Sequence, residues 1–165
     1  MSAPTEQTVP ADAARPTVDP RSPRFGAAIT AVLLLIVVFL GVAGAGIAAL
    51  VLLAAIAALF AWGAFAGVRR HPYGALFRRF IRPRLAPPAE LEDAAPPTFA
   101  QLVGFIVTAI GVLVGLLGIA PAVPIAAAVA FIAAFLNAVF DYCLGCQIYL
   151  LLMRSGLVGR SPSAG

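Results

Sequence analysis

The sequence has no lysine, a single histidine and two cysteines among its 165 residues, and only 11% of its residues are charged. Two cysteines are too few for a secreted fold held together by several disulfides. A zinc site needs four ligands, and the one histidine, His71, is remote in sequence from both cysteines. No nucleotide-binding loop, hydrolase triad or carboxylate pair is visible, which argues against classical enzymes. We predict no bound cofactor and leave enzymatic activity open.

Apolar residues are what the chain has in excess. They make up 62% of it, and the mean hydropathy of +1.01 is far above the range of soluble proteins. All eleven basic residues are arginines, and they sit in short segments beside the apolar runs. Arginines in such positions set the orientation of a membrane protein. The net charge of +4 of the chain therefore does not indicate a nucleic-acid partner. The sequence therefore predicts an all-α integral membrane protein surrounded by lipid.

The apolar runs predict a bundle of four transmembrane helices. No residue from Phe25 to Val68 is charged, over roughly twice the ~20 residues that cross a bilayer. The glycines of segment 41–46 divide this run into a helical hairpin. Two small-xxx-small pairs, Gly63–Gly67 and Gly111–Gly115, predict close helix packing. The predicted spans lie at about 25–42, 45–68, 99–119 and 125–153, in a membrane domain at 25–154 between disordered tails at 1–24 and 155–165.

The loop between the second and third spans predicts a short amphipathic helix in the membrane interface, from Pro72 to Pro83. Its apolar face holds Tyr73, Phe77, Phe80 and Ile81, and its basic face holds Arg78, Arg79 and Arg82. His71, just before it, is interpreted as a solvated interfacial residue. No arginine lies in the two hairpin turns, so the positive-inside rule places both termini and this loop in the cytoplasm of a plasma-membrane protein. No cleaved targeting sequence is expected.

Both cysteines, Cys143 and Cys146, lie in the last apolar run. At this spacing on a helix their α-carbons would be about 5 Å apart, which a disulfide accepts. The spacing also matches the redox motif of thiol oxidoreductases. In an unbroken helix the pair would lie near the C-terminal end, where the helix dipole disfavours a thiolate. The redox interpretation therefore requires the helix to break and restart near Phe140.

The surroundings of the cysteines predict further polar contacts. A single helix over 125–153 would be roughly 43 Å long, against a hydrocarbon thickness of about 30 Å, so it must tilt, protrude or break, with Gly145 as the predicted weak point. Asp141 is the one carboxylate inside any apolar segment, at a cost on the order of 3 kcal/mol. On a continuous helix Asn137, Asp141 and Gly145 form a polar stripe, with Tyr142 beside it. Asp141 is a candidate proton relay for the thiols, or marks where the helix reaches the interface.

A set of short segments, in this order, is more specific than any one of them. The segments are Asp19-Pro20-Arg21, Pro23-Arg24-Phe25, Arg70-His71-Pro72-Tyr73-Gly74, Phe77-Arg78-Arg79, Arg82-Pro83-Arg84, Pro87-Pro88-Ala89-Glu90, Pro97-Thr98-Phe99-Ala100-Gln101, Ala134-Phe135-Leu136-Asn137 and Cys143-Leu144-Gly145-Cys146. The combination resembles the uncharacterised bacterial membrane family called domain of unknown function 4395. That resemblance implies four membrane helices, a Cys-Leu-Gly-Cys signature and a place in the bacterial inner membrane. It carries no established activity, and Asp141 stands where the family pattern implies an apolar or small residue, against a family-wide proton relay.

Relatives of this family are expected beside thioredoxin-like and sulfurtransferase proteins, which favours thiol or sulfur chemistry. The leading hypothesis is a thiol/disulfide or sulfur-relay component that exchanges with such a cytoplasmic partner. Cys143 would be the more buried, resolving thiol and Cys146 the more accessible one. Two alternatives stay open: a binding or transport subunit that holds a soft metal such as copper(I) between the two thiolates, and a structural protein whose cysteines only pack. Nothing in the sequence predicts an oligomeric state.

Overall fold

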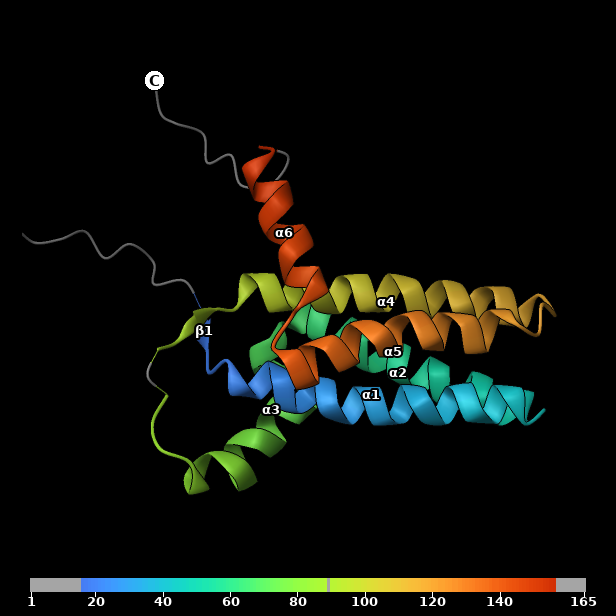
Figure 1. The fold of residues 1–165 in the computed structure, drawn as a ribbon, viewed down its shortest axis with the longest axis horizontal. Coiled ribbons are helices and arrows are strands. Elements are labelled where there is room, and N and C mark those ends of the chain that lie inside the picture. Colours follow the sequence, from blue (N-terminus) through green and yellow to red (C-terminus); the bar gives the residue numbers. More distant parts are fainter. Residues whose placement is uncertain (1–15, 89, 157–165) are drawn as a thin grey trace, which may run out of the picture.

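A computed structural model of the chain describes residues 16–88 and 90–156, and within them four long apolar helices run side by side (Figure 1). They are α1 (Arg21–Val42), α2 (Gly46–Ala66), α4 (Ala95–Leu116) and α5 (Ala122–Phe140). Each is long and apolar enough to cross a membrane. The predicted fold class, an all-α bundle with four membrane-crossing helices, is confirmed. Most of the tails predicted at 1–24 and 155–165 lies outside the described residues.

The two ends of the bundle differ in charge. At one end, short turns join α1 to α2 and α4 to α5, and they contain no charged residue. The opposite end carries the strands, the short helices and a sixth helix, α6 (Leu144–Arg154) (Figure 1). Every arginine among the described residues lies in or beside these segments. This is the charge asymmetry on which the predicted cytoplasmic orientation rests, and the orientation itself stays a prediction.

Part of the predicted N-terminal tail is ordered. Strand β1 (Thr17–Val18) pairs antiparallel with β2 (Glu92–Asp93), just before α4. The Asp19 carboxylate accepts hydrogen bonds from Nε and a terminal nitrogen of Arg21, at 3.0 and 2.9 Å, and these bonds hold the pKa of Asp19 below its usual value. The same guanidinium donates to the carbonyl of Ala86, at 3.1 Å. The chain before α1 is thus attached to the loop before α4.

The predicted amphipathic helix is present as one helical segment made of three kinds of turn. After the 3₁₀ turn η1 (Val68–Arg70), it consists of α3 (Pro72–Leu76), the π-helical turn η2 (Phe77–Ile81) and the 3₁₀ turn η3 (Arg82–Arg84). Phe77 is buried, with its ring centroid 5.8 Å from that of Phe25 on α1. Phe80 is 49% exposed, and the guanidinium of Arg79 lies 5.8 Å from its ring centroid. The segment is therefore anchored to the bundle through Phe77.

Small residues let the helices approach closely. A Cβ on Gly111 would contact the Cβ of Ala126 on α5, and one on Gly115 would lie 2.6 Å from Cγ2 of Val123. The packing predicted for this pair is confirmed, and its partner is a helix of the same chain. Gly67 has another role, because it ends α2 at a φ of +82°. The buried core beside this contact consists of Leu34, Val37, Ala49, Leu53, Ile56, Val123, Ala127 and Ala130.

We predict that Gly111→Ala destabilises the protein by about 1–3 kcal/mol, because neither methyl carbon can move unless the backbones of α4 and α5 separate. Thermal unfolding in detergent measures the effect. Gly46→Ala is the matched control, since a Cβ on Gly46 would meet nothing within 4 Å. Equal unfolding temperatures for the two variants would contradict the close contact.

Candidate functional site

The last apolar run is not one helix, which corrects the span predicted at 125–153. Helix α5 ends at Phe140, and Asp141 adopts a left-handed conformation with φ 58° and ψ 25°. The backbone N–H of Tyr142 then donates to the carbonyl of Leu136, at 3.2 Å, which closes the end of α5. A helix of 19 residues is about 29 Å long, close to the hydrocarbon thickness. The chain therefore leaves the helix where a bilayer would end.

A second helix starts directly after this turn, with Cys143 as its N-cap residue. The Sγ atom of Cys143 accepts a hydrogen bond from the backbone N–H of Cys146, at 3.2 Å. A disulfide joins the two cysteines, whose α-carbons are 5.2 Å apart. The break that the redox interpretation requires near Phe140 is present. The pair consequently lies at a helix N-terminus, where the helix dipole and free N–H groups favour a thiolate.

Gly145 packs against α4, so the prediction that the helix is weakest there is wrong. A Cβ on Gly145 would lie 2.5 Å from both Cα and Cβ of Ala100. Further along α6, the ring of Tyr149 lies 5.6 Å from that of Phe99 on α4. These contacts direct α6 away from the bundle instead of along it (Figure 1). Its apolar side chains beyond the contact are exposed, as in a helix that lies in a membrane interface.

The predicted polar stripe does not form, because the helix turns at its middle member. Asn137 lines a cavity inside the bundle. Asp141 instead forms an ion pair with Arg24 on α1, at 3.3 Å, in which both side chains are exposed. Tyr142 is 47% exposed. Among the described residues, no hydrogen bond joins Asp141 to either cysteine. The proton-relay role of Asp141 stays a prediction, while its conformation makes it the residue that ends α5.

A partly open cavity of about 270 Å³ lies beside Cys143 and between all four long helices. Cys143 contributes to its wall, whereas Cys146 does not. Most of the lining is aliphatic or small, and the polar lining consists of Ser22, Thr30, His71, Tyr73, Gln101 and Asn137. Sequence reasoning missed most of this cavity, because its residues come from distant parts of the chain.

His71 is buried, which corrects its interpretation as a solvated interfacial residue. Its Nδ1 accepts a hydrogen bond from the backbone N–H of Tyr73 at 3.2 Å, and its Nε2 lies 3.1 Å from the carbonyl of Leu59. These partners fit a neutral ring with the proton on Nε2. Burial lowers the pKa of His71 and raises that of Tyr73, so the ring stays neutral and the phenol stays protonated.

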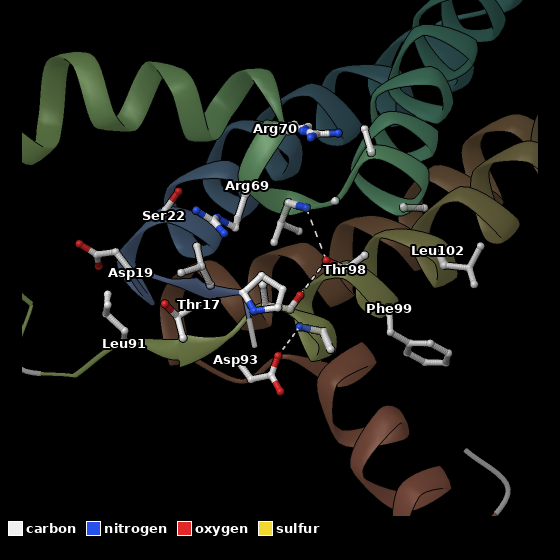
Figure 2. A pocket seen from close by; sticks show the side chains of 18 of the residues that line it. Thr17, Asp19, Ser22, Arg69, Arg70, Leu91, Asp93, Thr98, Phe99 and Leu102 are labelled. Carbon is white, nitrogen blue, oxygen red and sulfur yellow. Dashed lines mark hydrogen bonds between the residues drawn. The ribbon is translucent and has the colours of Figure 1, made fainter. Parts of the chain in front are cut away.

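A second, larger depression of about 1370 Å³ lies on the arginine-rich end of the bundle (Figure 2). Figure 2 shows Arg69 and Arg70 on one side of this cleft and Phe99 and Leu102 of α4 on the other. Four arginines and two aspartates, Asp19 and Asp93, line it, so we call it the basic cleft. Thr98 joins the two sides, since its Oγ1 accepts from the backbone N–H of Val68 at 3.4 Å and donates to the carbonyl of Ala94. Tyr149 and Met153 of α6 also line the cleft. Helix α6 therefore borders it.

Few side chains around the cysteines could bind a metal ion. Within 16–88 and 90–156, no group of three or more histidine, cysteine, aspartate or glutamate side chains is placed to hold a metal ion. Both sulfur atoms are used by the disulfide in this state of the molecule. A soft metal would therefore have to be held by the reduced pair alone.

The chain matches the family model described as Domain of unknown function (DUF4395) over residues 18–154. The match covers most of the chain, so this protein belongs to that family, as the resemblance in its sequence predicts. No curated protein and no solved structure matches it. The functional interpretation consequently depends on the geometry of the site.

We predict that Asp141→Val lowers the free energy of unfolding by about 1–2 kcal/mol, because a β-branched residue is strained in the left-handed conformation. Asp141→Gly is the matched variant, since glycine adopts this conformation freely and the exposed ion pair contributes little. Thermal unfolding of both variants in detergent measures the difference. The Asp141→Gly protein also tests the proton relay. If Asp141 relays protons to the thiols, this variant should exchange thiols more slowly than the wild-type protein, and the pH profile of the exchange rate should shift.

We also predict that the protein loses stability as the pH falls below about 6.5, the ordinary pKa of histidine. Burial keeps the His71 ring neutral in the folded protein, whereas the same ring is protonated in the unfolded chain once the pH falls below about 6.5. The unfolded state then binds more protons than the folded state, so the free energy of unfolding decreases as the pH falls further. Unfolding temperatures measured between about pH 5 and 8 give the slope. His71→Asn retains a good N-cap residue without a titrating ring, so its slope should be smaller. An unchanged slope would contradict the assignment to His71.

Proposed function

We propose that this protein is a membrane thiol–disulfide exchange component whose redox pair is Cys143 and Cys146. The observation that carries the proposal is the N-cap position of Cys143, with its Sγ on the backbone N–H of Cys146. A cysteine placed only for packing needs no such position, whereas a redox pair benefits from a helix N-terminus that favours the thiolate. The Cα separation of 5.2 Å also lets the bond open and close without backbone rearrangement.

The exchange follows from the two positions. A thiolate of the partner attacks Sγ of Cys146, which forms a mixed disulfide and breaks the bond to Cys143. The electron pair stays on Sγ of Cys143, where the N-terminal amides of α6 stabilise the thiolate. The second thiol of the partner then attacks its own sulfur in the mixed disulfide and releases Cys146. The partner leaves as a disulfide, and the protein is left as a dithiol.

These steps support the roles expected from the sequence. Cys143 lines the cavity and is the leaving and resolving sulfur, while Cys146 lies outside the cavity lining and receives the partner. By the positive-inside rule the pair is on the cytoplasmic side of the plasma membrane, within reach of a thioredoxin-like protein. A sulfurtransferase partner would deliver sulfur to the same outer thiol. The basic cleft beside α6 favours a partner with an acidic surface.

Single-cysteine variants test the proposal. We expect Cys143→Ser to accumulate a mixed disulfide that forms in the reverse direction, when the Cys146 thiolate attacks the disulfide of an oxidised partner. In the wild-type protein the Cys143 thiol would then attack Sγ of Cys146 and release the partner as a dithiol, and this resolving sulfur is missing in the variant. Cys146→Ser should accumulate much less, because its remaining cysteine, Cys143, lies in the wall of the cavity. The measurement is non-reducing electrophoresis of cells quenched with acid and then labelled with a maleimide that adds mass.

The double variant Cys143→Ser/Cys146→Ser is the control for adducts that form elsewhere. In the wild-type protein the same labelling should reveal both disulfide and dithiol forms as growth conditions change. Thiols that stay reduced and unreactive under every growth condition would contradict the exchange proposal. Copper(I) bound tightly by that reduced protein, and lost in either single variant, would select the soft-metal alternative instead.

A further inference from the structure

The cavity beside Cys143 is large enough to hold a small ligand. It lies between α1, α2, α4 and α5, and its walls are mostly aliphatic, including Ala130, Ala134 and Val107. Its volume of about 270 Å³ is close to the lower end of ligand pockets, which start at about 300 Å³, and suits a single small ring system. Because the four helices can span a bilayer, a molecule that reaches this cavity from the side has to dissolve in lipid.

Two polar side chains of the cavity are available to a ligand. The amides of Gln101 and Asn137 line it from α4 and α5, and in the described part of the chain neither has a hydrogen-bond partner. The N–H groups of both amides can donate hydrogen bonds, so a ligand with carbonyl oxygens can accept from them. The protonated phenol of Tyr73 lines the same cavity.

The disulfide chemistry specifies what such a ligand does. A protein that oxidises its partner is left as a dithiol and needs an acceptor for two electrons before it can act again. Cys143 belongs to the cavity wall, so a ligand in the cavity lies beside this residue. An apolar site, unpaired hydrogen-bond donors and a redox-active sulfur occur together here, and a flat apolar ring with carbonyl oxygens that accepts two electrons fits all of them.

We propose that the cavity binds the ring of a lipid-soluble quinone, which reoxidises Cys143 and Cys146. The proposal rests on the exchange function above. The thiolate of Cys143 adds to a ring carbon, and the thiolate of Cys146 then attacks Sγ of Cys143. The sulfur–sulfur bond forms, the sulfur–carbon bond breaks, and the electron pair passes to the ring. The two protons that the thiols lose balance the two that the quinone oxygens take up, so dithiol and quinone become disulfide and hydroquinone.

The neighbouring basic cleft provides a polar region next to this reaction. The cavity and the cleft share the lining residues Val18, Ser22 and Val68, so only one layer of side chains separates them. Protons released by the thiols can therefore exchange with the polar side of the protein, while the ring stays in apolar surroundings.

The test uses the full-length protein, reduced and then freed of reductant in lipid nanodiscs, with a short-chain ubiquinone analogue as the probe. We expect one hydroquinone for each disulfide regenerated, followed by ultraviolet absorbance and by thiol counting. Ala134→Phe, which fills the cavity, should slow this oxidation about tenfold or more. Disulfide exchange with oxidised glutathione should keep its wild-type rate in this variant. Ala58→Phe, at an exposed position of α2, is the control for an added ring.

If Ala134→Phe does not fold, Asn137→Leu is used in its place. The leucine is close in size to asparagine but has no amide group. This substitution should raise the probe concentration that gives the half-maximal rate several-fold. Oxidation that is equally fast in the wild-type, Ala134→Phe and Asn137→Leu proteins would overturn the cavity site. Exchange with glutathione but no reaction with the quinone would reject the quinone alone. Failure of both reactions would reject the exchange function itself.

Discussion

The structure depends on the way the chain turns between α5 and α6. Within hydrocarbon every backbone polar group must find a partner inside the protein, so a chain can leave a helix only near the bilayer border. Asp141 turns there in a left-handed conformation, and the carbonyl of Leu136 accepts from the backbone N–H of Tyr142. The sulfur of Cys143 then accepts a hydrogen bond from the backbone N–H of Cys146 in the first turn of α6. One short turn thereby closes one helix, opens the next and places the disulfide at a helix N-terminus.

That turn places the cysteine pair between two different environments. On one side lies a partly open, mostly apolar cavity between the helices, and at the same end of the molecule lies a cleft lined by four arginines and two aspartates. The neutral ring of His71, held by Tyr73 and Leu59, keeps charge away from the cavity. A disulfide at such a border can meet a water-soluble protein with one sulfur and a lipid-soluble molecule with the other. This geometry is the physical basis for both functional proposals.

Several local patterns predicted the site only in part. The spacing of Cys143 and Cys146 identified the pair, because three residues of helix bring two sulfur atoms together wherever the helix lies. The stripe through Asn137, Asp141 and Gly145 was wrong, since helical periodicity holds only while the helix continues. His71 was misplaced as well, because a polar residue beside an arginine is normally solvated. His71 is buried where α2 lies against the start of α3: the carbonyl of Leu59 on α2 is 12 residues away in sequence, whereas Tyr73 is only 2 residues away.

Hydropathy and charge alone determined the membrane class, the four apolar helices and the concentration of arginine at one end, because each is a property of a continuous window of sequence. The tertiary structure decided where the last run breaks. The left-handed conformation of Asp141 and the contact of Gly145 with Ala100 depend on residues outside the local stretch of sequence. It also decided the cavity, where Thr30, Gln101 and Asn137 meet from three separate helices. Pairing of distant helices follows from shape and packing density, which the order of residues along one helix does not reveal.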